Sequence, residues 1–78
     1  MKTECELILY SRPGCHLCDV AAGLLDAAGH RWREVDIDGN PELAERYGVL
    51  IPVVRIANTE RELGFPFDAE GLARFLTG

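Results

Sequence analysis

The sequence has little cysteine, almost no lysine and no long apolar run. Its 78 residues include three cysteines and a single lysine, Lys2, among eight basic residues. No apolar run approaches a membrane span, and the first six residues lack the core of a signal peptide. The net charge is −5, and the scattered basic residues form no basic face. These absences argue against membrane and nucleic-acid partners and predict a cytoplasmic protein.

The length and composition indicate one small folded domain. A chain of 78 residues allows a single domain, over residues 1–78, with one modest core. Its 47% hydrophobic and 27% charged residues are typical of globular proteins. We find no internal repeat, low-complexity tract or linker in the sequence, and we expect a monomer.

Two cysteines, Cys15 and Cys18, stand where a strand is predicted to end and a helix to begin. Residues 7–10 favour a strand, and residues 11–14 then signal a turn. Apolar residues follow at spacings of three and four, one face of an amphipathic helix, at Leu17, Val20, Ala21, Leu24, Leu25 and Ala28. A strand-to-helix junction is a favourable place for thiol chemistry.

The start of a helix stabilises a thiolate. Its first N–H groups lack partners within the helix, and the macrodipole places partial positive charge there. We therefore expect the pKa of Cys15 to fall below its ordinary value. Cys18 lies one turn further on and more shielded, which predicts that Cys15 attacks and Cys18 resolves the mixed disulfide. Among the flanking charges, Arg12 and His16 favour the thiolate and Asp19 opposes it.

Two other uses of a CxxC pair have less support. A closed zinc site needs four ligands, and the remaining candidates, Cys5, His16 and His30, have no partner at CxxC-like spacing. A structural disulfide closing so short a loop gains little stability. A metal- or partner-binding module whose cysteines never cycle stays open as the alternative.

The rest of the chain predicts further strands and two more helices. Gly29 ends the first helix, and Asn40 and Pro41 form the start of a short second one, with Gly48 as its left-handed stop. Asp68 caps the last helix. Three more strands are expected, over residues 31–37 at a sheet edge, 51–56, and 61–64. The predicted order is β-α-β-α-β-β-α, with a parallel first pair and an antiparallel hairpin in a four-stranded mixed α/β sheet flanked by helices.

Together these motifs resemble the thioredoxin superfamily and, within it, the small glutaredoxin-like proteins. Residues 10–18 are similar to the glutaredoxin segment that runs from strand through loop to CxxC. Residues 36–43 resemble the second strand running into the second helix, and residues 47–54 resemble the segment that carries the family's cis-proline. The resemblance covers nearly the whole chain. It implies a thioredoxin-like fold and a thiol–disulfide oxidoreductase with no bound cofactor beyond a redox-active disulfide.

The resemblance also assigns roles to individual residues. Cys15 corresponds to the nucleophile, Cys18 to the resolving thiol and Pro52 to the cis-proline. Ile51, which precedes that proline, corresponds to the residue whose backbone pairs with an extended substrate.

The chain departs from glutaredoxins at the glutathione site. Only Gly64 and Asp68 correspond to its glycine turn and acidic residues, and residues 65–67 replace small residues with Phe-Pro-Phe. Arg12 can still hold one glutathione carboxylate in a bidentate contact. Because phenylalanine rings give a charged tripeptide no donors, we predict better handling of a protein disulfide. The reductant is expected to be a thioredoxin-reductase-type donor, or glutathione as co-substrate.

Overall fold

The structure is a computed structural model that describes residues 6–77. Its elements, in chain order, are β1 (Leu7–Ser11), α1 (His16–Ala28), β2 (Trp32–Asp36), the 3₁₀ turn η1 (Ile37–Gly39), α2 (Pro41–Tyr47), β3 (Val53–Ile56), β4 (Glu62–Gly64) and α3 (Ala69–Thr77). The predicted order β-α-β-α-β-β-α is confirmed. The added 3₁₀ turn begins at Ile37, where the predicted second strand was still expected to continue.

The four strands form one mixed sheet in the order β2-β1-β3-β4. β1 is parallel to β2 and antiparallel to β3, and β3 is antiparallel to β4. Within this register Leu9 of β1 lies opposite Glu34 on one side and Val54 on the other. The charged strand β2 therefore lies at a sheet edge, as predicted.

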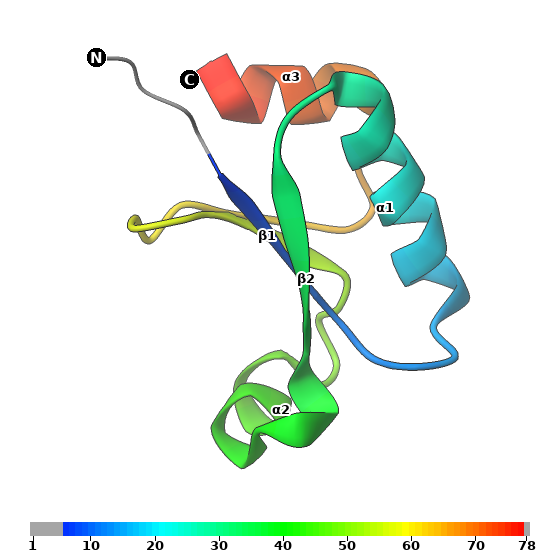
Figure 1. Ribbon diagram of the computed structural model, residues 1–78, viewed down its shortest axis with the longest axis vertical. Helices are drawn as coiled ribbons and strands as arrows, with labels where there is room; N and C mark the ends of the chain where they lie inside the picture. The colour runs from blue at the N-terminus through cyan, green and yellow to red at the C-terminus, as the bar shows by residue number, and fades with distance from the viewer. Residues whose placement is uncertain (1–5, 78) are drawn as a thin grey trace.

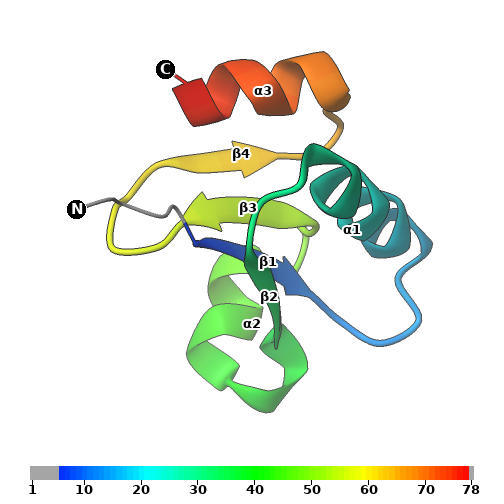
Figure 2. The same ribbon diagram turned by 45° about the horizontal axis from the view of Figure 1, so that its top comes forward.

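Helices cover both faces of the sheet (Figures 1 and 2). Side chains alternate along β1, so Leu7 and Leu9 face α1 and α3 while Ile8 and Tyr10 face α2. The larger core, on the α1 and α3 side, contains Leu7, Leu9, Ala21, Leu25, Val54, Ile56 and Leu72. The smaller core, on the α2 side, contains Ile8, Tyr10, Ile37, Tyr47 and Val53.

The predicted helix ends are largely present. The Asn40 side chain accepts hydrogen bonds from the N–H groups of Glu42 (2.9 Å) and Leu43 (3.3 Å), with Pro41 at the first helical position. Gly29 ends α1 at a φ of 78°, a conformation that favours glycine. Asp68 Oδ1 accepts from the N–H of Gly71 at 2.7 Å and so caps α3.

The predicted left-handed stop at Gly48 is wrong. Gly48 has φ −53° and ψ −36°, a right-handed conformation open to any residue. The chain continues in a right-handed turn there because the Tyr47 carbonyl accepts from the N–H groups of Leu50 (2.8 Å) and Ile51 (3.1 Å). A Cβ at Gly48 would collide with the carbonyl oxygen of Ala44, so close packing explains the glycine.

The apolar face predicted for α1 is only partly buried. Ala21 and Leu25 are fully buried, whereas Leu17 is 48% and Val20 is 42% exposed. Periodicity identified the helix but could not show that its first turn would leave these two side chains exposed.

Candidate active site

The cysteine pair lies at the start of α1, directly after β1. The loop that joins β1 to α1 includes Gly14, whose φ of 79° few other residues adopt. Cys15 is the N-cap of α1, and Cys18 stands in the first turn. The two cysteines form a disulfide with their Cα atoms 5.2 Å apart.

The two sulfur atoms have different surroundings. Cys15 Sγ accepts the backbone N–H of Cys18 at 3.1 Å, in the way that a capping side chain does. Cys15 is partly exposed, whereas Cys18 is only 3% exposed. In the reduced state the same N–H can stabilise a thiolate on Cys15. The geometry thus favours ionisation and access at the first cysteine.

The peptide bond between Ile51 and Pro52 is cis, as the resemblance implied. Pro52 is buried, and its carbonyl accepts the N–H of Phe65 at 3.2 Å, which connects this loop to the end of β4. The N–H of Ile51 donates to the Tyr47 carbonyl at 3.1 Å. That donor is therefore already used within the chain, and pairing of a substrate backbone beside Ile51, which stays a prediction, rests on its carbonyl.

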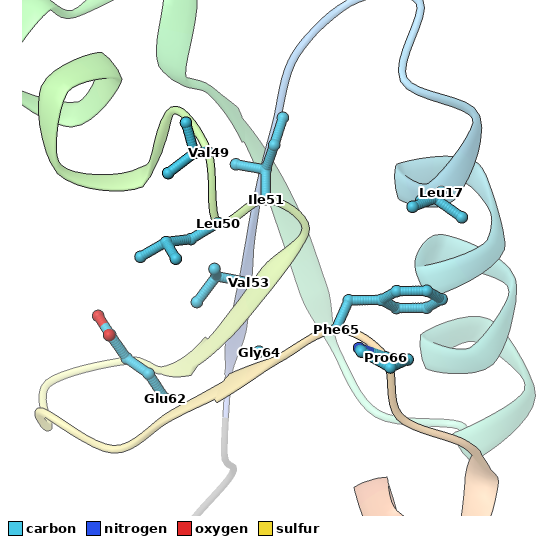
Figure 3. A pocket seen from close by; sticks show the side chains of 9 residues that line it. All are labelled: Leu17, Val49, Leu50, Ile51, Val53, Glu62, Gly64, Phe65 and Pro66. Carbon is cyan, nitrogen blue, oxygen red and sulfur yellow. The ribbon is translucent and has the colours of Figure 1, made fainter.

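An apolar groove of about 540 Å³ opens between α1, the loop before β3, and the end of β4. Figure 3 shows Leu17 and Phe65 at the α1 end and Glu62 at the far end. Val49, at 96% exposed, and Leu50, at 55%, lie on the loop side of the groove. Its lining consists of Leu17, Val49, Leu50, Ile51, Val53, Glu62, Gly64, Phe65 and Pro66.

A second, polar hollow of about 300 Å³ lies against the buried cysteine. Ser11, which is 1% exposed, donates its hydroxyl hydrogen bond to Glu34 inside this hollow. The lining consists of Ser11, Arg12, Pro13, Gly14, Cys18, Asp19, Glu34 and Asp36. Three carboxylates thus share a hollow with Cys18.

The residues predicted to bind substrate lie in three different places. Ile51 and Gly64 line the apolar groove, while Arg12 lines the polar hollow with its Nε 3.2 Å from Asp38 Oδ1. Asp68 lies on neither, and the carboxylate oxygen that caps α3 is occupied there. Neither Arg12 nor Asp68 lines the groove, so neither is placed to bind a ligand through the groove lining. Cys5 lies outside the described residues.

Sequence reasoning missed a cluster beneath the groove. The rings of Tyr10 and Tyr47 stack with their centroids 4.4 Å apart, and the Tyr47 hydroxyl donates to Glu62. Burial, followed by the hydrogen bond and charge of Glu62, raises the pKa of Tyr47 to about 12. No local signal links Tyr47 and Glu62, which are 15 residues apart.

Sequence reasoning also missed a second cis peptide bond, between Phe65 and Pro66. The only available signal was the X-Pro bond itself, in a turn directly after a predicted strand. The ring of Phe65 packs edge-on to that of Phe67, with centroids 5.4 Å apart.

Within residues 6–77, no helix is long and apolar enough to cross a membrane. Over the same residues, no group of three or more His, Cys, Asp or Glu side chains is placed to hold a metal ion.

Known proteins are similar to this chain in fold and, to different degrees, in sequence. Protein XcR50 from X. campestris has a similar structure with a TM-score of 0.84 at 42% identity, covering 91% of this chain and 95% of that one. The glutaredoxin grx-1 from Archaeoglobus fulgidus has a TM-score of 0.68 at 19% identity, covering 95% and 88%, and shows the fold alone. The SPbeta prophage-derived thioredoxin-like protein YosR of Bacillus subtilis is 29% identical over 58 residues, 73% of this chain and 72% of that protein.

These likenesses confirm the thioredoxin-like α/β fold and the predicted glutaredoxin-like resemblance. The family model described as "Glutaredoxin-like domain (DUF836)" matches residues 6–77, which include the cysteine pair, the cis-proline and the groove. The chain belongs to this glutaredoxin-like domain family.

Proposed function

We propose that this protein is a thiol–disulfide oxidoreductase whose Cys15–Cys18 pair exchanges two electrons with a substrate disulfide. The observation that carries the proposal is the Cys15–Cys18 disulfide at the start of α1, with Cys15 Sγ accepting a helix N–H. The cis-proline Pro52 and membership of a glutaredoxin-like family support it.

The reaction has two exchange steps. The Cys15 thiolate attacks one sulfur of the substrate disulfide, forms a mixed disulfide and releases the other sulfur as a thiolate. Cys18, as its thiolate, then attacks the Cys15 sulfur, forms the Cys15–Cys18 disulfide and releases the second substrate thiol. The substrate gains two electrons and, after protonation, becomes a dithiol. An external thiol reductant returns the two electrons to the pair.

The substrate we propose is a protein disulfide. The groove next to α1 is mainly apolar, and the only charged residue in its described lining is Glu62. The two carboxylates of glutathione find no basic partner in that lining, so burying them there is costly. The reductant is a thioredoxin-reductase-type donor, with glutathione as a weaker co-substrate. Sustained reduction of substrate disulfides needs a supply of reductant, as in the cytoplasm, so we propose a cytoplasmic location. We also propose a monomer without membrane or nucleic-acid partners.

Reduction of insulin with a supplied reductant tests this function. We expect catalysis by the wild-type protein and loss of catalysis in Cys15→Ser, because no other described cysteine caps the helix. Full activity of Cys15→Ser would contradict the mechanism. A comparison of a glutathione mixed disulfide with a protein disulfide under one reducing system tests the substrate, and a strong preference for glutathione would contradict it.

The second candidate is a metal- or partner-binding module whose cysteines never cycle. The exposed Val49 and Leu50 favour it, because exposed apolar side chains near a groove are typical of interaction sites. Metal analysis of protein purified under reducing conditions separates the candidates. Stoichiometric metal without reversible thiol chemistry supports the module, and a reversible dithiol without metal supports the oxidoreductase.

A further inference from the structure

The far end of the apolar groove carries a single fixed negative charge. Among residues 6–77, Glu62 is the only charged residue that lines the groove, and it lies at the opposite end from Leu17 and Phe65, which are at the α1 end (Figure 3). The rest of the lining is glycine, proline and apolar side chains. A ligand that fills the groove from its α1 end outward therefore meets apolar walls first and the Glu62 carboxylate afterwards.

The Glu62 carboxylate is held in place by its neighbours. The buried Tyr47 hydroxyl donates to Oε2, and Arg55 Nη1 lies 3.9 Å from the same oxygen, at the outer limit of an ion pair. Arg55 is also directed elsewhere, because its Nε donates to the Thr59 carbonyl at 2.7 Å. The Glu62 side chain remains 27% exposed, and a carboxylate has acceptor positions for further donors. Since it is already ordered, binding a cation there loses little side-chain entropy.

The exposed apolar lining of the groove favours an occupant with apolar side chains. Val49, Leu50 and Leu17 are 96%, 55% and 48% exposed, so an occupant that covers them gains hydrophobic free energy. The one basic residue of the loop after β1, Arg12, is paired with Asp38 beside the other hollow. An anionic occupant would thus meet a carboxylate and lack a basic partner in the lining, and the net charge of −5 would oppose its approach.

Resting on the proposed function, we infer that the groove binds an extended protein segment with apolar residues next to its disulfide and a basic residue further along. The apolar side chains cover Leu17, Val49 and Leu50, while the lysine or arginine reaches Glu62. The charge complementarity selects among protein disulfides, and it disfavours segments with an acidic residue at the same place.

Three matched peptides test this specificity with the full-length reduced protein. Each has one cysteine in a mixed disulfide with thionitrobenzoate and the same apolar neighbours, and they differ at one distal position, which is Lys, Gln or Glu. We expect rate constants in the order Lys, Gln, Glu, with steps of about threefold, as for one exposed ion pair. Because the effect is electrostatic, the steps should shrink at high ionic strength.

Two variants assign this order to the groove. Glu62→Gln keeps an acceptor for the Tyr47 hydroxyl but removes the charge, so the ratio of the Lys to the Glu peptide should fall toward one. Glu60→Gln removes an equal charge from an exposed residue of the same hairpin that does not line the groove, and it should leave the ratio unchanged. The peptide order and its salt dependence in the wild type do not depend on either variant folding.

The outcomes separate this inference from the proposed function. If the wild type reduces none of the peptides and no insulin, the proposed function fails. If it reduces all three at equal rates, or if Glu60→Gln changes the ratio as much as Glu62→Gln, the inference fails while the oxidoreductase stands. Faster reduction of a glutathione mixed disulfide than of the Lys peptide would also overturn it.

Discussion

The two hollows near the start of α1 differ in chemistry and in whether a cysteine lines them. The groove of about 540 Å³ on the Pro52 side is apolar and is reached from Leu17 in the first turn of α1. The hollow of about 300 Å³ is polar, contains Glu34 and is lined by Cys18 itself. One side therefore suits an apolar substrate segment, while the other surrounds the buried thiol with negative charge.

In the function proposed above, this difference suits the two cysteines, which are only three residues apart, to separate tasks. A partly exposed cysteine whose sulfur accepts a helix N–H is suited to attack, and Cys15 has both properties. Cys18 is buried and shares its hollow with three carboxylates, and burial and negative charge both disfavour a thiolate. The predictions below test the comparison, from the largest expected effect to the smallest.

The largest effect is expected from Cys18→Ser, which removes the buried thiol and leaves the exposed one. Insulin turnover should fall by about 100-fold or more, because the two cysteines act as one unit. The first exchange step should persist, so a mixed disulfide on Cys15 should accumulate and be detected by mass spectrometry. If Cys18→Ser turns over normally without trapping substrate, the division of tasks is wrong.

The next largest effect concerns the stability contributed by Tyr47, whose hydroxyl donates to the groove residue Glu62. Its pKa is raised to about 12 in the folded protein from 10.0, so its contribution to stability is complete below pH 10 and is lost as the pH rises toward 12. Between pH 9 and pH 12 the free energy of unfolding should fall by on the order of 2 kcal/mol through this residue. Urea unfolding at both pH values measures it.

Tyr47→Phe is the control for this pH dependence. The variant keeps the ring that stacks on Tyr10 but has no hydroxyl to ionise or to bind Glu62. Its unfolding free energy should fall less over the same pH range. An identical fall in both proteins would show that Tyr47 does not carry the effect.

A smaller effect is expected from the apolar wall of the groove. Leu17→Ser should lower kcat/KM for insulin by about threefold to tenfold, because a half-exposed leucine offers about 1 kcal/mol of burial to a substrate. A small aromatic disulfide, which does not fill the groove, serves as the second substrate and should be less affected.

Val20→Ser is the matched control, since Val20 is similarly exposed on the same helix but does not line the groove. It should leave both rates unchanged. Equal losses in the two variants would remove the groove from the account of substrate binding.

The smallest effect is expected in the polar hollow. Glu34→Gln keeps an acceptor for the Ser11 hydroxyl and removes one negative charge from the surroundings of Cys18. Resolution of the mixed disulfide should become about twofold to threefold faster near neutral pH, because the Cys18 thiolate is less disfavoured. Rapid-quench kinetics measures this step, and Glu45→Gln on the exposed surface of α2 is the control. Slower resolution in Glu34→Gln would contradict the electrostatic role of the hollow.

Local signals predicted most of the fold. Asn40, Gly29 and Asp68 act at helix ends through their own side chains or backbone freedom, and the structure bears out all three. The prediction of a left-handed conformation at Gly48 failed, because the backbone there depends on which N–H groups beyond the helix donate to the Tyr47 carbonyl. The exposure of Leu17 and Val20 depends on what else covers α1, which periodicity does not contain.

The site was predicted only where its chemistry is local. The CxxC pair and Pro52 stand out in the sequence, and the structure has the pair bonded and the proline cis. The contact of Tyr47 with Glu62 and that of Arg12 with Asp38 join residues 15 and 26 positions apart. Such contacts follow from the sheet topology. No sequence pattern therefore indicated that Glu62 would line the groove and that Arg12 would lie outside it.

A redox titration of the two thiols tests the central claim most directly. Protein with Cys5→Ser is equilibrated in graded dithiol and disulfide mixtures, quenched in acid, alkylated and weighed by mass spectrometry. We predict that Cys15 and Cys18 gain two labels together in one reversible transition. The transition should have the slope of a two-electron couple, about 30 mV for each tenfold change in the ratio of reduced to oxidised protein. A pair that stays wholly oxidised or wholly reduced across the range, or two cysteines that take up label independently, would contradict the account.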